Sequence, residues 1–263
     1  MSALRNPQST IRNLLGLFFP ARCRICGLLL EEITRVPVCR SCWEAVTPLP
    51  ARGQCSICGL PVAGDLADNP GFRCGDCIKH PPYFDLARSY GAYGGALREL
   101  VHLLKYNGMT PLAKPLGERL AETAQSQSPP WAEVFIRCQA VVAMPLDPAR
   151  RRSRGYNQAQ MLARAAARRL QLPLLAGACI RVRATPPQAG LSRLQRQINV
   201  KGAFAADKRR VEGLVVLLVD DVMTTGATLN SCAQALLQAG AGEVLGLTVA
   251  RALEHSDSLG GVV

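Results

Sequence analysis

Residues 215–229, VVLLVDDVMTTGATL, constrain the fold of this chain more than any other segment. The apolar run at their start is typical of a parallel strand that is buried on both faces. Asp220 and Asp221 follow this run, and the ligands of open α/β sheets bind beyond the carboxyl ends of the strands. A strand, a short polar loop and an amphipathic helix in this order predict one unit of a doubly wound, mostly parallel sheet.

The loop after the two acids is rich in groups that can hold an anion. It contains Thr224, Thr225, Gly226, Ala227 and Thr228. Their hydroxyls and backbone N–H groups lie at the expected start of a helix, where the helix dipole favours negative charge. An apolar strand that ends in Asp and is followed by a Thr cap is also an ordinary structural arrangement. Two acids and three threonines in one turn exceed what a cap needs, so we expect a ribose-phosphate site.

Strands and helices alternate along the rest of the chain. We expect strands near residues 140–144, 178–182 and 244–250, short strand pieces within 83–93, and helices near 96–105, 112–124 and 157–170. This alternation predicts a parallel, doubly wound sheet. The expected division is an N-terminal arm at 1–20, a Cys-rich module at 21–80, the α/β domain at 83–252 and a tail at 253–263.

Eight of the 11 cysteines form four C-x-x-C pairs in the Cys-rich module. The pairs are Cys23/Cys26, Cys39/Cys42, Cys55/Cys58 and Cys74/Cys77. Disulfides are the alternative, but a basic chain without a recognisable secretion signal disfavours them. Two C-x-x-C turns complete one tetrahedral thiolate site, so four pairs predict two structural Zn²⁺ sites that are closed to substrate. Whether consecutive or alternating pairs share an ion stays open.

The remaining cysteines and the histidines receive structural interpretations. Cys138, Cys179 and Cys232 stand alone among small or apolar neighbours, which is typical of buried hydrophobes. His80 lies close to Cys77, but eight cysteines already fill two zinc sites. Lys105 closes the expected helix 96–105 and is interpreted as an ordinary partner of the helix dipole.

A net charge of +12 and a pI near 9.5 favour anionic partners. Phosphorylated metabolites, nucleic acids and acidic membrane surfaces belong to this class. The apolar stretch LLGLFFP at residues 14–20 is much shorter than the ~18 residues that a membrane-spanning helix needs. We therefore expect a cytoplasmic protein without a membrane span.

A second polar segment, MPLDPARRRSRGYNQ at residues 144–158, again follows an expected strand and precedes an expected helix. The candidate ligand-binding residues in it are Pro145, Arg154, Gly155, Asn157 and Gln158. A run of arginines is often only a solvated surface. A basic loop at the carboxyl end of a strand, however, is where a second phosphate group would bind.

Residues 181–204, RVRATPPQAGLSRLQRQINVKGAF, form a long polar segment inside the α/β domain. Its candidate functional residues are Arg181, Arg183, Gln188, Arg196 and Asn199. One interpretation is an exposed basic loop or a surface helix at 191–197. The other is a mobile hood that closes over phosphates and excludes water.

Together these segments resemble the ComF family, and most closely its GntX-like branch. The matching motifs are CRIC, CRSC, CSIC, CGDC, LLKYNG, PLDPARRRSRGYNQA, RVRATPPQAGL and LLVDDVMTTGATL, which extend over about residues 15–252. The resemblance implies an N-terminal double zinc ribbon and a domain of the type I phosphoribosyltransferase kind.

The resemblance also implies a ligand, phosphoribosyl pyrophosphate (PRPP) with Mg²⁺. Asp220 and Asp221 would bind the ribose hydroxyls, loop 224–228 the 5-phosphate, and the loop around Arg154 the pyrophosphate. The implied role is DNA uptake or utilisation through binding of single-stranded DNA, with DNA-uptake proteins as further partners. The alternatives are an active phosphoribosyltransferase with an unidentified acceptor and a ligand-sensing regulator. No nucleobase pocket has a recognisable signature in the sequence.

Overall fold

The structure is a computed structural model that describes residues 21–30, 34–62, 64, 68–125, 129–186 and 193–253. The expected arm at 1–20 and the expected tail beyond residue 253 lie outside the described residues. No helix in the described part of the chain is long and apolar enough to span a membrane.

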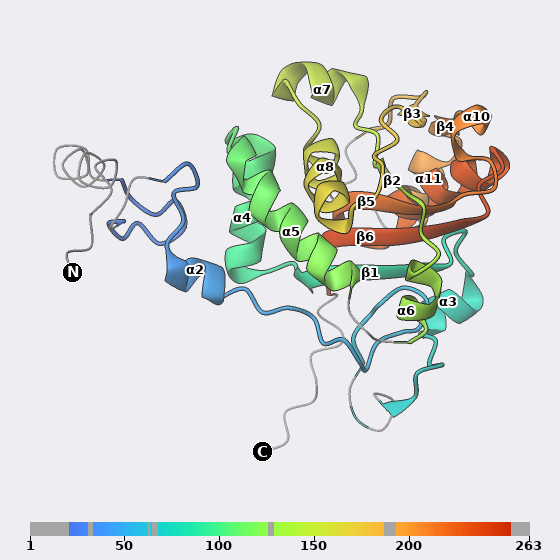
Figure 1. The fold of residues 1–263 in the computed structure, drawn as a ribbon, viewed down its shortest axis with the longest axis horizontal. Helices are drawn as coiled ribbons and strands as arrows, with labels where there is room; N and C mark the ends of the chain where they lie inside the picture. Colours follow the sequence, from blue (N-terminus) through green and yellow to red (C-terminus); the bar gives the residue numbers. More distant parts are fainter. Residues whose placement is uncertain are drawn as a thin grey trace, which may run out of the picture.

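A parallel sheet of four strands lies at the centre of the α/β domain (Figure 1). Its strands, in spatial order, are β1 (Leu86–Ala92), β6 (Glu243–Arg251), β5 (Val215–Met223) and β2 (Ala140–Ala143). The two inner strands are almost wholly buried, which explains their unbroken apolar runs. The prediction of a doubly wound parallel sheet is confirmed. Short strand pieces were expected within 83–93, where the chain forms a single strand of seven residues.

Each face of the sheet carries its own core, because successive residues of a strand point to opposite faces. Leu217 and Val219 of β5 pack with three helices on one face, and Val216 and Leu218 pack with α11 on the other. The three helices are α4 (Gly95–Tyr106), α5 (Ala113–Ala124) and α8 (Gln158–Leu170), and α11 spans Ala227–Gln238. The short helix η2 (Thr110–Leu112) joins α4 to α5.

Short elements complete the α/β domain. They are α6 (Trp131–Phe135), α7 (Pro148–Arg154), α9 (Arg193–Val200), α10 (Lys208–Val211) and the antiparallel pair β3 (Cys179–Arg181) and β4 (Phe204–Ala206). The expected strand at 178–182 therefore exists, but it pairs outside the main sheet. Helix α9 bears out the interpretation of residues 191–197 as a helix, although it begins and ends later.

The Arg-rich segment that was expected to be a loop folds into helix α7. Asp147 caps this helix, because its carboxylate accepts hydrogen bonds from the backbone N–H groups of Ala149 and Arg150. Pro148 at the first helical position suits the fixed backbone angle of proline. The helix ends at Gly155, whose φ of 82° is typical of a glycine C-cap.

The Cys-rich module contains the short helices α2 (Arg40–Glu44) and α3 (Gly75–Lys79) and two clusters of cysteine side chains. One cluster joins Cys23, Cys26, Cys39 and Cys42, and the other joins Cys55, Cys58, Cys74 and Cys77. Within each cluster the sulfur atoms all lie within 4.8 Å of one another. Consecutive C-x-x-C pairs therefore share a site, which settles the pairing that the sequence left open.

Part of the Cys-rich module lies along the outer edge of β1. The backbone N–H of Ala87 donates to the carbonyl oxygen of Ile57 at 2.6 Å, and that of Leu49 donates to the carbonyl oxygen of Tyr90 at 2.7 Å. A Cβ atom on Gly59 would lie 2.6 Å from the carbonyl oxygen of Ala87. The glycine thus permits the second cysteine cluster to sit directly against the sheet.

Candidate functional site

A polar cavity of about 310 Å³ opens beside the carboxyl ends of β2 and β5. Residues from α4, the turn between α7 and α8, β3 and α9 complete its wall. The charged and amide side chains that line it are Lys105, Arg150, Arg154, Asn157, Gln158, Arg181, Arg196, Asp220 and Asp221. Such a position, outside the carboxyl ends of parallel strands, is where open α/β sheets bind their ligands.

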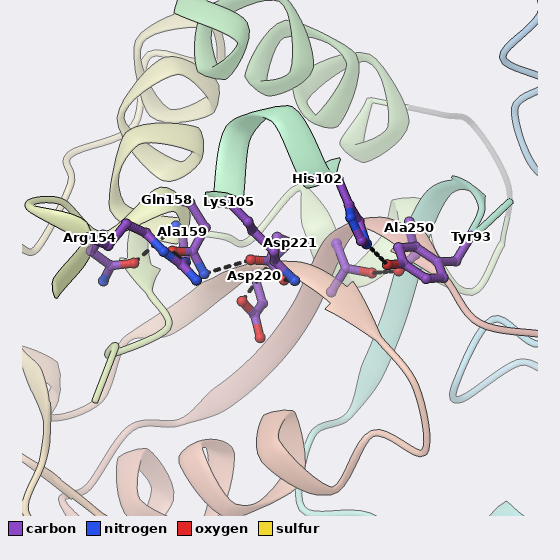
Figure 2. Close-up of polar contacts among 11 residues, drawn as sticks. Tyr93, His102, Lys105, Arg154, Gln158, Ala159, Asp220, Asp221 and Ala250 are labelled. Atoms are coloured by element: carbon purple, nitrogen blue, oxygen red, sulfur yellow. Dashed lines mark hydrogen bonds and ion pairs between the residues drawn. The ribbon is translucent and has the colours of Figure 1, made fainter. Parts of the chain in front are cut away.

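Asp221 is held from two sides (Figure 2). The Nζ atom of Lys105 lies 2.7 Å from Oδ1 of Asp221, and Nε2 of Gln158 donates to Oδ2 at 2.6 Å. The carbonyl oxygen of the Gln158 side chain accepts a hydrogen bond from Arg154, which fixes the orientation of the amide. Each carboxylate oxygen of Asp221 therefore has one protein donor, and these contacts fix the orientation of the group at the cavity.

Lys105 is charged at neutral pH despite its buried position. Burial alone would lower the pKa of Lys105, but the attraction of the Asp221 carboxylate outweighs it, and the net shift is upward. The ion pair lies at the end of α4, so it ties this helix to β5 at the cavity.

Asp220 has a different environment from its neighbour. Its Oδ1 accepts a hydrogen bond of 2.8 Å from the backbone N–H of Asp221. Burial, and next the negative charge of Asp221, raise the pKa of Asp220 to about 8, although Lys105 acts in the opposite direction. Asp220 therefore holds a proton near neutral pH, and a ligand that needs its carboxylate must displace that proton.

Two arginines bring unpaired donors to the cavity. The Nε atoms of Arg181 and Arg196 are buried, and neither has a hydrogen-bond partner among the described residues. Arg181 also donates to Thr185 and stacks over the ring of Phe204, with 5.4 Å between the guanidinium carbon and the ring centre. Burial lowers the pKa of Arg181, and Asp147, whose Oδ2 lies 4.0 Å from the Nε atom, opposes that shift. Buried unpaired donors are costly, and an anionic ligand would satisfy them.

The loop at the start of α11 lines two cavities. Thr224 and Thr228 line the polar cavity, and Thr224 also lines a neighbouring one of about 110 Å³ together with Thr225, Gly226 and Ala227. Gly226 has a φ of 77°, a value that favours glycine. The predicted loop residues are thus together in the fold, but only part of the loop faces the two acids.

The second predicted set is largely brought to the cavity. Pro145, Arg154, Asn157 and Gln158 line it, whereas Gly155 lines a different hollow. In the third set, Arg181 and Arg196 line the cavity, but Arg183 donates to the backbone carbonyls of Asn199 and Lys201, and Asn199 donates to that of Pro186. Arg183 and Asn199 therefore fasten the segment to itself. Gln188 lies outside the described residues.

Several lining residues were missed at the sequence level, and three of them have side chains that matter for an anionic ligand. They are Lys105, Tyr106 and Arg150. The interpretation of Lys105 as a mere partner of the helix dipole was wrong, because its ammonium group pairs with Asp221. Tyr106 lies under Arg154, with 5.3 Å between the guanidinium carbon and the ring centre. The motif LLKYNG contains two of these residues and was the signal that could have found them.

The two cysteine clusters have the donor set of structural zinc sites, since each offers four thiolates and leaves no position for substrate. Backbone N–H groups point at their sulfur atoms: that of Cys39 at the sulfur of Cys23, and that of Cys74 at the sulfur of Cys55, each at 3.3 Å. Such N–H···S contacts suit charged thiolates, so the residues fit Zn²⁺ at both places.

Two buried arginines flank the second cluster. Arg251 of β6 donates to the carbonyl oxygen of Cys58 at 2.7 Å and approaches its sulfur at 3.4 Å. Arg88 of β1 donates to the carbonyl oxygen of Ser56, and burial lowers the pKa of Arg88 to about 10. Four thiolates around Zn²⁺ carry a net negative charge, which these guanidinium groups offset.

Comparison with known proteins assigns two parts of the chain. A model of the double zinc ribbon domain matches residues 14–78, and a model of the phosphoribosyl transferase domain matches residues 157–255. The DNA utilization protein YhgH of Salmonella typhimurium is 33% identical over 229 residues, which cover 87% of this chain and 96% of the relative. This chain belongs to the ComF family.

Other relatives agree with this assignment. Competence protein F of Haemophilus influenzae is 32% identical over 237 residues, which cover 89% of this chain and 99% of the relative. Competence protein ComFC of Bacillus subtilis is 25% identical over 209 residues, which cover 77% of this chain and 79% of the relative. The ComF family member described here therefore joins a double zinc ribbon to a phosphoribosyltransferase-type α/β domain, as the sequence predicted.

Proposed function

We propose that this ComF family member binds PRPP together with Mg²⁺ in the polar cavity and acts on single-stranded DNA in DNA uptake or utilisation. The observation that carries the first part is the composition of one cavity wall. A carboxylate pair and several guanidinium groups, two of them with unpaired buried donors, face the same space of about 310 Å³. A ligand with both hydroxyl and phosphate groups matches this combination.

In this proposal the two acids have separate tasks. Asp220 is the main acceptor for the ribose hydroxyls, because no side chain of the described residues donates to it, whereas each oxygen of Asp221 already has a donor in Lys105 or Gln158. Asp221 holds that arrangement in place from within the protein. Thr224 and Thr228, with the backbone N–H groups at the start of α11, bind the 5-phosphate.

The pyrophosphate is assigned to the cationic wall. Arg150 and Arg154 approach from α7, and Arg181 and Arg196 from β3 and α9, so the phosphate oxygens meet donors from separate elements. Mg²⁺ prefers phosphate oxygens and water and would neutralise the charge of the pyrophosphate when bound. We place Mg²⁺ in this cavity and assign no particular residue as its ligand.

Phosphoribosyl transfer is a second candidate function, and Asp220 is the observation that favours it. A carboxyl group with a pKa of about 8 has the basicity that suits general base catalysis near neutral pH. In that reaction an acceptor N–H nucleophile would form a bond to C1 of the ribose, the bond to pyrophosphate would break, and Asp220 would take the acceptor proton. Binding without turnover would instead fit a ligand-sensing regulator.

Support for the DNA role comes from charge and from the relatives. The net charge of +12 favours a polyanion, and relatives that cover most of the chain are named DNA utilization protein and competence protein. Their names describe those proteins, and we extend the role to this one by proposal.

The test begins with calorimetric titration of PRPP and Mg²⁺ into zinc-loaded protein. We expect saturable binding that is lost in Asp220→Ala/Asp221→Ala and weakened in Arg181→Met. Arg209→Met, at an exposed position on α10, is the matched control and should bind as the original chain does. A panel of nucleobases then tests for pyrophosphate release. Absence of PRPP binding at millimolar concentration would rule out the ligand, and binding without release would rule out the transferase candidate.

A further inference from the structure

A larger hollow of about 760 Å³ lies between α5 and α8, next to the polar cavity. Five of the residues that line it are cationic, namely Lys114, Arg151, Arg164, Arg168 and Arg169, against a single carboxylate, Glu118. We call this hollow the α5–α8 groove. It belongs to the outer surface of the domain, because α5 and α8 turn their opposite faces to the sheet.

The five cations are exposed, and none of them forms an ion pair in the described part of the chain. Arg164 and Arg168 are one helical turn apart on α8, where like charges repel each other. Basic residues in the last turn of a helix are ordinary dipole partners, which would explain Arg168 and Arg169 alone. Lys114 and Arg151 come from other elements, so the dipole does not explain the whole set.

Between the cations part of the lining is apolar. Pro111, Met161 and Ala165 lie there with the ring of Tyr156, whose hydroxyl donates to the carbonyl oxygen of Leu104. A small free phosphate would make no favourable contact with these apolar side chains. Single-stranded DNA has both parts, because its phosphates are charged and its unpaired bases present flat faces that stack on rings and guanidinium planes.

We propose that the α5–α8 groove is the surface on which single-stranded DNA binds. This inference rests on the proposed DNA role and gives it a location that differs from the basic segment 181–204. Phosphates contact the five cations, and bases lie against Tyr156 and the apolar floor. Segment 181–204 instead serves the polar cavity through Arg181 and Arg196.

The groove and the polar cavity meet at α7 and at the turn between α7 and α8. Arg150 and Arg154 line the cavity, whereas Arg151 and Gly155 line the groove, and Asn157 lines both. The two hollows are adjacent, and apart from Asn157 they use different side chains of α7 and of the turn that follows it. DNA and PRPP can therefore be bound at the same time, and saturating PRPP does not displace DNA.

The experiment measures fluorescence anisotropy of a labelled 20-nucleotide oligo(dT) with zinc-loaded full-length protein. Arg164→Gln/Arg168→Gln is compared with Lys208→Gln/Arg209→Gln, which removes the same charge from exposed positions on α10. We expect the groove variant to bind about tenfold more weakly at low salt, and its salt slope to be smaller by about 1.4, since each phosphate contact on a single strand contributes about 0.7. The α10 variant should stay within about twofold of the original chain.

Calorimetric PRPP binding and thermal unfolding show that the groove variant is folded. Equal DNA affinity of the groove variant and the original chain would overturn the proposal that the α5–α8 groove binds DNA, while leaving the DNA role intact. Equal weakening by both variants, or displacement of the oligonucleotide by PRPP, would overturn it as well. Poly-glutamate that binds with the same dependence on Arg164 and Arg168 would point to an acidic protein and reject DNA. If the original chain binds no oligonucleotide at all, the DNA role itself fails.

Discussion

The ammonium group of Lys105 lies 2.7 Å from the carboxylate of Asp221, although the two residues stand on α4 and β5 and are far apart in the sequence. This contact distinguishes the two adjacent acids. Asp221 is bound by protein donors, and Asp220 remains available to a ligand.

The ion pair between Lys105 and Asp221 leads to a first prediction. Lys105→Met leaves a nearly buried carboxylate without its counter-charge, which should lower the free energy of unfolding by about 3 kcal/mol. Urea unfolding measures the loss. Lys105→Met/Asp221→Asn should recover part of it, and the exposed Lys114→Met should change stability by less than about 0.5 kcal/mol. If Lys105→Met and Lys114→Met unfold alike, the pair contributes nothing.

The pKa of Asp220 leads to a second prediction, on pH. Because ionised Asp220 must accept the ribose hydroxyls, and its pKa is about 8, PRPP affinity should rise with pH and level off above pH 8. Below the pKa we expect about a tenfold gain per pH unit. Titrations between pH 6.5 and 9 measure this, and the Asp220→Asn variant corrects for ionisation of the ligand phosphates. Asp220→Asn should bind weakly and without that slope; an equal slope in this variant would assign the titration to another group.

The raised pKa of Asp220 also affects stability. PRPP affinity should rise with pH, whereas the free energy of unfolding should fall. The folded state of Asp220 holds its proton up to about pH 8, whereas the unfolded carboxyl releases it near pH 4. The contribution of protonated Asp220 to the free energy of unfolding is thus fully present below the unfolded pKa, and it is lost as the pH rises through about 8. Ligand-free Asp220→Asn should therefore gain stability over the original chain between pH 5 and 8. Urea unfolding at pH 5 and at pH 8 measures the difference in unfolding free energy between the variant and the original chain. The same difference at both pH values would contradict the prediction.

The two cysteine clusters differ in exposure, which predicts two rates of zinc release. Cys26 of the first cluster is exposed, whereas all four cysteines of the second are buried. A chelator with a metal-sensitive dye should show two ions per chain, one released quickly and one slowly. Cys26→Ala should remove the fast phase only. One ion per chain, or a single phase that Cys26→Ala leaves intact, would contradict the assignment.

Arg251 leads to a further prediction about the second cluster. Arg251→Met removes a buried guanidinium beside the Cys58 thiolate, so we expect faster release of the slow ion and a loss of about 3 kcal/mol in unfolding free energy. Arg251→Lys should restore part of the metal retention. The control is Arg137→Met, which breaks an exposed pair with Glu243 and should cost less than about 1 kcal/mol. Unchanged slow release in Arg251→Met would show that the arginine serves only packing.

Local patterns carried most of what could be predicted from the sequence. The strand, loop and helix around Asp220 follow from hydrophobic periodicity, and the cysteine knuckles follow from spacing within four residues. The Lys105–Asp221 contact and the sharing of ions by consecutive cysteine pairs depend on how distant segments pack, and no periodicity encodes that.

Two errors have identifiable physical causes. The segment of α7 carried an Asp–Pro start signal at Asp147 and Pro148, but the arginines after it were interpreted as a polar loop. The strand near Cys179 is only three residues long, and so short a run does not reveal which sheet it joins. Its pairing with β4 instead places Arg181 beside the polar cavity.

The contacts of Ile57 and Leu49 with β1 have a consequence for the architecture of the whole chain. A parallel sheet with a bare outer strand offers unpaired N–H and C=O groups to any passing strand, and such edges promote aggregation. The ribbon module occupies that position through the N–H of Ala87 and the carbonyl of Tyr90. The zinc-ribbon module therefore covers the exposed edge of the α/β sheet. A fragment that starts at β1 would keep the ligand cavity, but its uncovered edge strand would promote self-association.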